Sequence, residues 1–307
     1  MSISFFIKDL KDREGMTVEK ALEIGGTISQ YTLDESDENA DEFLQEKLGI
    51  FECILLGEDG KSARGFELSY NKENKYYGIR VFTPCSIGDW EVVFEFIKKL
   101  GQYLENNKII DEDGIEYSTE SIKDYPYIEN IKYGIESLND NLNKKGSEIS
   151  KLYGIYRPIS FNKELLEKIK SSKNPVEAFS QLITEIQYID AYSASQNFYR
   201  DNKDGKIFGV YTLTEGVRTI LPFKPSVEYE NLNIVKNKDI KFWKIMLVVI
   251  NGDPNDEDSY EMLGDSEYSN FIANLPKDRY SFIDGEYILV EPLKREELEK
   301  IYKLTGE

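Results

Sequence analysis

Strand-like and helix-like segments come in groups along this chain, and the grouping limits the folds open to it. Strand-like segments at 51–56, 66–70 and 76–82 follow one another across polar turns, which predicts an antiparallel meander. A hairpin is predicted from Ile207 to Phe223, and a buried strand at 242–250 follows it. A doubly wound parallel sheet would need strands and helices in alternation. The grouping therefore indicates an α+β protein with mostly antiparallel sheets packed against helices.

Two long helices are predicted from apolar residues that recur every three or four positions. The first begins after Ser86 and carries the stripe Trp90, Val93, Ile97, Leu100 and Leu104. The second begins near Pro126 and ends at Gly146, where a polar segment starts. That segment predicts a boundary between two α+β domains of similar size, at 1–146 and 147–307. One continuous unit is the alternative.

A local pattern recurs at 77–84, 153–158 and 287–292. Each segment is strand-like, ends on proline and leads within a few residues into a predicted helix. A duplicated strand-to-helix unit would produce this recurrence. The simpler interpretation is that proline ends strands and starts helices, because its φ is fixed and it lacks an N–H group.

The chain contains no histidine, and this absence excludes whole classes of mechanism. No Ser-His-Asp or Cys-His pair can form, and no imidazole is available as a general base or a metal ligand. Any chemistry must rest on carboxylates, Lys, Arg, Tyr or a thiol. We expect no cofactor, with magnesium or calcium as the alternative.

The charge of the chain points to the kind of partner it would attract. With 38 Lys and Arg against 57 Asp and Glu, the formal net charge is −19, which repels nucleic acid and anionic membranes at long range. A basic protein is the better electrostatic match. The longest apolar run, at 245–250, is far too short to span a bilayer, and two cysteines suit a reducing compartment. These features predict a cytoplasmic protein.

Two sequence features suggest catalytic chemistry only at first sight. The stretch at 57–62 ends in Gly-Lys-Ser after a strand, but two residues separate its glycines where a phosphate-binding loop needs four. A strand-like segment follows it, so a hairpin turn is favoured. Cys85 lies at a predicted helix start, where a thiolate would be stabilised. A small packed residue is the favoured interpretation, because no second cysteine lies nearby.

An acidic segment at 251–258 directly follows the apolar strand. Its carboxylates Asp253, Asp256 and Asp258 are hard oxygen ligands of the kind that magnesium or calcium prefers. The spacing does not fit a calcium-binding loop, because Asp258 stands where the sharp turn needs glycine. A metal site at these residues is one interpretation, and a solvated turn is the favoured one.

Aromatic residues gather in a segment that has little helical or strand periodicity. Tyr188, Tyr192, Phe198 and Tyr199 lie there among polar side chains, a composition typical of binding surfaces. Ordinary loop packing accounts for it equally well. We keep these residues as a candidate binding surface.

Two segments and the overall length resemble a bacterial family known only as a domain of unknown function, number 4299. The segments are the opening Ser-Ile-Ser-Phe-Phe-Ile-Lys and the junction from Phe82 to Trp90. The resemblance covers essentially the whole chain and implies a bacterial cytoplasmic protein, but it brings no functional residues with it.

The sequence supports two hypotheses from different classes. The leading one is a non-catalytic cytoplasmic binding protein whose acidic surface neutralises a basic protein, such as a toxin. The alternative is a carboxylate or magnesium-dependent enzyme that acts on a phosphate-containing substrate through the acidic segment. The oligomeric state stays open.

Overall fold

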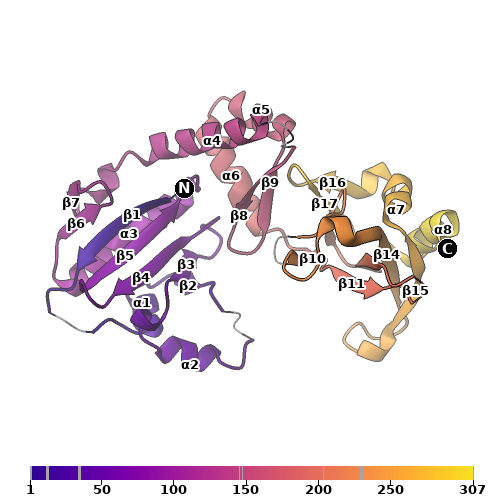
Figure 1. The fold of residues 1–307 in the computed structure, drawn as a ribbon, viewed down its shortest axis with the longest axis horizontal. Coiled ribbons are helices and arrows are strands. Elements are labelled where there is room, and N and C mark those ends of the chain that lie inside the picture. Colours follow the sequence, from indigo (N-terminus) through magenta and orange to yellow (C-terminus); the bar gives the residue numbers. More distant parts are fainter. Residues whose placement is uncertain are drawn as a thin grey trace. The chain divides into compact units, whose positions relative to one another are not determined.

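The computed structural model describes residues 2–11, 14–33, 36–144, 146, 148–202, 204–228 and 231–306 (Figure 1). The fold is α+β with mostly antiparallel sheets, as the grouping of segments predicted. The chain divides into two compact units, Met1–Tyr188 and Ile189–Glu307. Residue 147, which opens the predicted second domain, lies outside the described residues.

The N-terminal unit is built on a seven-stranded antiparallel sheet with strand order β2-β3-β4-β5-β1-β6-β7. Its strands are β1 (Ser2–Lys8), β2 (Ile28–Gln30), β3 (Ile54–Glu58), β4 (Phe66–Asn71), β5 (Tyr76–Phe82), β6 (Lys108–Asp111) and β7 (Glu116–Ser118). The strands β3, β4 and β5 form the predicted meander. Along β1, Phe5 and Ile7 are fully buried while Phe6 points to the opposite face, so the two faces of the sheet have different environments.

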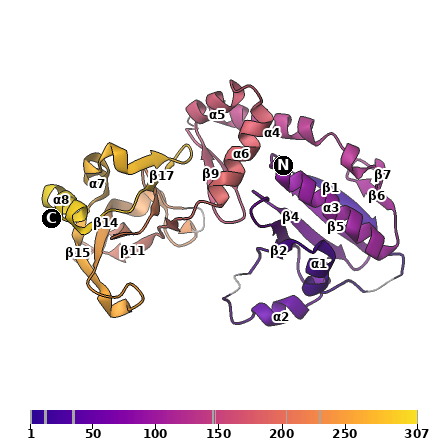
Figure 2. The same ribbon diagram turned by 180° about the vertical axis from the view of Figure 1, so that it is seen from behind.

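Helix α3 (Ile87–Leu104) lies along one face of this sheet (Figure 2). Ser86 caps its N-terminus, where the sequence predicted the helix to begin, and forms a capping box with Asp89. All five residues of the predicted apolar stripe are fully buried. Phe5 of β1 meets Trp90 of α3 edge to face, with ring centroids 6.3 Å apart. The stripe on α3 therefore forms the centre of the N-terminal core.

The same core includes residues well beyond 146, so the N-terminal unit extends past the predicted boundary. The remaining elements of the unit are α1 (Val18–Gly25), α2 (Ala40–Gln45), α4 (Tyr127–Asn143), β8 (Ser150–Tyr153), β9 (Pro158–Phe161), α5 (Lys163–Lys170) and α6 (Pro175–Gln187). Phe161 stacks on Phe179 with centroids 5.7 Å apart, and both belong to the core that contains α3. The observed division at 188/189 thus falls later than the predicted boundary at 146/147.

The recurrent strand-proline-helix pattern holds at two of its three positions. Pro84 separates β5 from α3, and Pro292 separates β17 (Tyr287–Val290) from α8 (Arg295–Thr305). At the middle position the prediction is wrong, because Pro158 begins β9 in a two-stranded sheet. Proline is tolerated as the first residue of a strand with a free edge, where no ladder N–H is needed.

The C-terminal unit contains two four-stranded sheets around one core, ordered β11-β12-β14-β15 and β10-β13-β17-β16. The remaining elements are β10 (Tyr192–Ser193), β11 (Asn197–Arg200), β12 (Ile207–Thr214), β13 (Thr219–Pro222), β14 (Ile240–Ile250), β15 (Tyr260–Glu267), α7 (Tyr268–Asn274) and β16 (Tyr280–Phe282). The predicted hairpin is wrong: β12 pairs in parallel with β14, and β13 pairs with β17 in the other sheet. The turn at Glu215 carries the chain from one sheet to the other, so each strand buries its apolar face in the shared core.

Among the described residues, no helix has the length and apolarity that crossing a bilayer would require.

Candidate binding site

The turn between β3 and β4, at residues 59–65, forms one wall of the candidate site. It leads into a strand and not a helix, which confirms the hairpin interpretation of the Gly-Lys-Ser stretch. The amide of Ser62 donates to the carbonyl of Glu58 at 2.8 Å, and the Ser62 hydroxyl accepts from the Glu58 amide at 3.0 Å. The turn is therefore closed on itself by local hydrogen bonds and offers no row of free amides to a phosphate.

A buried carboxylate fixes this turn to the start of α3. Oδ1 of Asp89 accepts from the amides of Ala63 at 3.0 Å and Gly65 at 2.8 Å, and Oδ2 accepts from the Ser86 amide at 2.9 Å. Burial raises the pKa of Asp89, while the hydrogen bonds from Ser86 and Gly65 act in the opposite direction. Asp89 thus holds the turn in place and has no face open to a ligand.

Arg64 completes the buried polar group beneath the turn. Its Nε donates to the carbonyl of Tyr153 at 2.9 Å, its Nη1 donates to that of Pro84 at 2.6 Å, and its guanidinium lies 4.8 Å from the centre of the Phe82 ring. Cys85 is fully buried beside this group, and burial raises the pKa of its thiol. The packed interpretation of Cys85 is the one the structure supports, because a buried neutral thiol is unreactive.

Three tyrosine side chains lie beside the turn, and their rings contact one another edge to face. The Tyr31 and Tyr156 rings are 5.4 Å apart and nearly perpendicular, and Tyr156 meets Tyr188 in the same way at 5.7 Å. The Tyr188 hydroxyl donates to the Ser62 carbonyl at 2.7 Å, and the Tyr156 hydroxyl donates to Oδ1 of Asp59 at 3.1 Å. Burial raises the pKa of Tyr31 and of Tyr188, so both hydroxyls stay protonated at neutral pH.

Tyr31, Tyr156 and Asp59 border a cavity of about 570 Å³ that we call the tyrosine pocket. It is lined by residues 29–33 together with Asp59, Ile155 and Tyr156. Gln30 stiffens one side, because its Oε1 accepts from the Thr32 amide at 2.9 Å and its Nε2 donates to the Leu33 carbonyl at 2.8 Å. Tyr156 is 53% exposed, so part of its ring surface is open to solvent.

The tyrosine pocket combines two features that attract cations. Asp59 supplies a carboxylate, and the electron-rich ring faces of tyrosine attract ammonium and guanidinium groups. The hydroxyls of Tyr156 and Tyr188 are neutral donors already engaged with a carboxylate and a carbonyl oxygen. The arrangement suits recognition of a positively charged side chain.

The structure divides the predicted aromatic surface between the two units. Tyr188 belongs to the N-terminal unit and lies beside the tyrosine pocket, whereas Tyr192, Phe198 and Tyr199 belong to the C-terminal unit. Phe198 packs edge to face on Trp243 at 5.9 Å, and Tyr199 stacks on Phe208 at 5.8 Å. Successive residues of a strand point to opposite faces, so Phe198 and Tyr199 do not share one surface.

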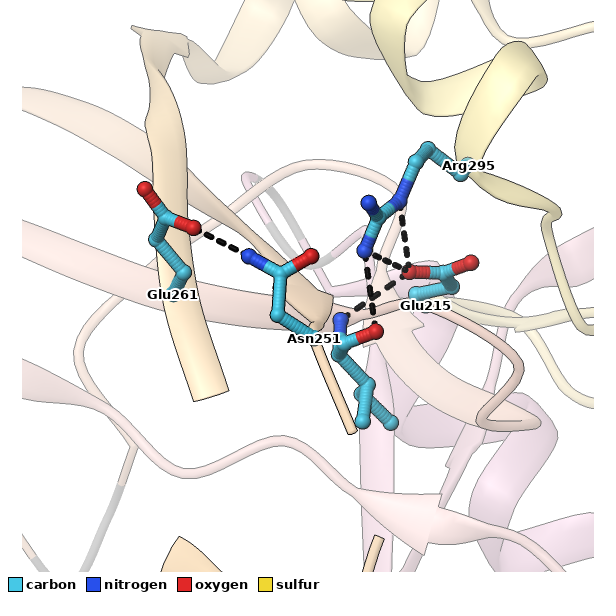
Figure 3. Close-up of polar contacts among 5 residues, drawn as sticks. Glu215, Asn251, Glu261 and Arg295 are labelled. Carbon is cyan, nitrogen blue, oxygen red and sulfur yellow. Dashed lines mark hydrogen bonds and ion pairs between the residues drawn. The ribbon is translucent and has the colours of Figure 1, made fainter. Parts of the chain in front are cut away.

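The predicted metal-binding segment follows β14 in the C-terminal unit, where neighbouring carboxylates already have partners. Figure 3 shows Arg295 reaching toward Glu215, and Asn251 turned toward Glu261. Oε2 of Glu215 accepts from the Ile250 amide at 3.0 Å and lies 3.3 Å from Nη2 of Arg295. These contacts join the end of β14 to the start of α8.

The acidic residues of the segment itself make local hydrogen bonds. Oδ1 of Asp253 accepts from the amide of Asn255 at 2.9 Å, and Oδ1 of Asp256 accepts from the amide of Asp258 at 3.1 Å. All three predicted ligands are exposed. Within the described ranges, no three His, Cys, Asp or Glu residues are grouped so that they could hold a metal ion. The metal site therefore stays a prediction.

Sequence reasoning did not identify the tyrosine pocket. Asp59 lay within the rejected phosphate-loop stretch and Tyr156 within the recurrent junction, while Tyr31 carried no signal. The residues come from distant parts of the chain, and no spacing rule links them. Tyr188 alone was among the predicted binding residues.

The fold defines the class of protein as an α+β protein of two compact units. A family model described as "Domain of unknown function (DUF4299)" matches residues 2–301, and the chain belongs to that family. This confirms the resemblance seen in β1 and at the start of α3. A comparison with curated proteins and with solved structures found no match.

Proposed function

We propose that this protein is a non-catalytic binding protein that captures a basic protein partner through the tyrosine pocket. The observation that carries the proposal is the placement of Asp59 beside the rings of Tyr31 and Tyr156 in one cavity. A lysine or arginine side chain entering this cavity would meet a carboxylate and aromatic faces together. The cytoplasm is the proposed location.

The overall charge supports the same partner. A net charge of −19 attracts a basic protein at long range and raises the rate of encounter. The pocket would then convert a general attraction into a specific contact. A basic toxin neutralised by complex formation is one partner of this kind.

The proposal can be tested with a fluorescein-labelled arginine-rich peptide and fluorescence anisotropy at two salt concentrations. We expect Asp59→Asn to weaken binding about tenfold, which corresponds to about 1.4 kcal/mol. Asp253→Asn is the matched control, because it removes the same charge from the exposed acidic segment. We expect the control to change binding less than about twofold, since one exposed charge contributes little.

A second pair of variants separates ring recognition from charge. Tyr156→Leu removes a ring of the pocket, and Tyr133→Leu removes a ring from the exposed face of α4, where Tyr133 is 62% exposed. We expect loss of affinity in Tyr156→Leu alone. Equal losses in each variant and its control would refute the pocket as the site, and for the aspartate pair they would show that the peptide is held by diffuse charge.

A further inference from the structure

A second cavity lies on the face of the N-terminal sheet opposite α3. It has a volume of about 690 Å³ and is bordered by β1, β5, β6 and the residues that follow β1, including Phe6, Leu10, Tyr76 and Ile110. Phe6 is paired with Gly78 of β5 on one side and with Ile110 of β6 on the other. We call this cavity the outer groove.

The floor of the outer groove is apolar, which is unusual for the solvent side of an antiparallel sheet. The Phe6 and Tyr76 rings meet edge to face with centroids 5.1 Å apart. Leu10 is 66% exposed at the rim. Next to Phe6 the sheet carries Gly78, and a Cβ atom there would come within 2.8 Å of the Ser69 hydroxyl oxygen. The same Cβ would lie 3.7 Å from the Phe6 ring, so Gly78 lets Ser69 and Phe6 pack close to the strand.

The charges around the outer groove differ in sign from those of the chain as a whole. Lys8 and Lys108 line it, and no Asp or Glu does so among the residues that the structure describes. Lys108 pairs with Glu116, but both side chains are more than half exposed, and such a pair contributes little. An incoming anion could therefore replace Glu116 at small cost. Glu116 also lies opposite Ile110 in the β6–β7 pair, so among the described residues Lys8 is the groove lysine whose charge no ion pair balances, in a chain with 57 Asp and Glu.

We propose that the outer groove binds a small amphipathic anion, a carboxylate carried on an apolar aliphatic or aromatic body. The apolar body would lie on Phe6, Tyr76 and Ile110, and the carboxylate would face the ammonium groups of Lys8 and Lys108. The volume lies in the range of small-molecule sites, which combine apolar walls with a few charged groups. This site is separate from the tyrosine pocket and takes a ligand of opposite charge.

The test uses the full-length protein with dodecanoate below its micelle concentration, followed by calorimetry. Dodecyltrimethylammonium is the matched probe, because it has the same chain and the opposite charge. We expect dodecanoate to bind at least about tenfold more tightly than the ammonium probe. Equal binding of the two probes, or no binding of dodecanoate at millimolar concentration, would overturn the proposal.

Two variants and one control locate the site. Lys8→Gln should weaken dodecanoate binding about fivefold, and Ile110→Asp should weaken it more, because it places a carboxylate on the apolar floor. Lys132→Gln removes the same charge from α4, where Lys132 forms an exposed pair with Glu129, and should leave binding within about twofold. Dodecanoate should also shift the amide resonances of Tyr76 and Ile110. Shifts confined to other residues would contradict the assignment.

Discussion

Each unit of the molecule ties a turn to the start of a helix through one carboxylate, but the two carboxylates are held in different ways. Asp89 in the N-terminal unit is fully buried and accepts hydrogen bonds from three turn amides and from the amide and hydroxyl of Ser86. Glu215 in the C-terminal unit keeps 24% of its side chain exposed and binds one amide and the guanidinium of Arg295.

The difference shows how the number of protein hydrogen-bond donors to a carboxylate depends on its burial. A buried carboxylate loses its hydration, and Asp89 regains the lost contacts from neutral N–H and O–H donors at fixed positions. A partly exposed carboxylate keeps some water, so Glu215 needs fewer protein donors. Removal of the side chain should therefore cost more in the N-terminal unit than in the C-terminal unit.

The largest effect is expected from Asp89→Ala, which leaves the turn amides and Ser86 without their acceptor. We expect the free energy of unfolding of the N-terminal unit to fall by about 3–5 kcal/mol.

The chain has two tryptophans, Trp90 in one unit and Trp243 in the other, so fluorescence of a Trp243→Phe background follows the N-terminal unit in urea. Glu91→Ala is the control, because its pair with Lys61 is exposed. A loss below about 1 kcal/mol would contradict the anchoring role of Asp89.

A smaller effect is expected from Glu215→Ala. The Ile250 amide and Arg295 would lose an acceptor that water can partly replace, so the C-terminal unit should lose about 1–2 kcal/mol. Fluorescence of Trp243 in a Trp90→Phe background measures this loss. Glu215→Gln should recover part of it, because the amide oxygen still accepts from Ile250. A loss equal to that of Asp89→Ala would remove the distinction between the two carboxylates.

The third prediction concerns alkaline solution and a tyrosine of the N-terminal unit. Burial and the charges of Tyr117 and Asp111 raise the pKa of Tyr125 to about 12. In the unfolded chain Tyr125 loses its proton near pH 10. The contribution of protonated Tyr125 to the free energy of unfolding is therefore complete below pH 10 and is lost as the pH rises through about 12. Urea unfolding between pH 9 and 12 should show a shallower decline in Tyr125→Phe. Parallel declines in the two proteins would refute the assignment.

The smallest effect is expected from Asp253→Asn. Asp253 is exposed, and its carboxylate accepts from the nearby amide and side chain of Asn255, so the free energy of unfolding should change by less than about 0.5 kcal/mol. Millimolar magnesium or calcium should shift the melting temperatures of wild type and variant equally. A metal-dependent rise in the wild type alone would establish the acidic segment as a metal site and restore the enzyme alternative.

The parts of the fold that follow from local periodicity were predictable. The stripe on α3 and the meander of β3, β4 and β5 repeat at the spacing of a helix turn or a strand pleat, so the sequence shows them directly. The partners of β12 were not predictable, because β14 lies beyond a long connection and only tertiary packing selects it. The prediction that a strand ends at Pro158 failed for a related reason. Proline indicates a boundary between elements, but it does not indicate which element follows.

The tyrosine pocket shows the same limit for function. Its side chains belong to β2 and its extension, to the turn after β3 and to the segment after β8, and they meet only once the N-terminal core has formed. The acidic segment at 251–258 was the more conspicuous candidate in the sequence, although its carboxylates make local contacts in the structure. A cluster of acidic residues along the chain thus reflects the acidic composition of the protein, and it does not show that side chains meet in one site.

The two cysteines of the chain differ in accessibility, and this gives the native protein a selective chemical handle. Cys85 is fully buried in the core, whereas Cys53 is half-buried beside Glu67 and Arg80 on the outer face of the N-terminal sheet. Burial and Glu67 raise the pKa of Cys53, so a maleimide dye should couple slowly at neutral pH and faster in mild alkali. A single dye would then report from the sheet face that carries the outer groove, with no engineered residue.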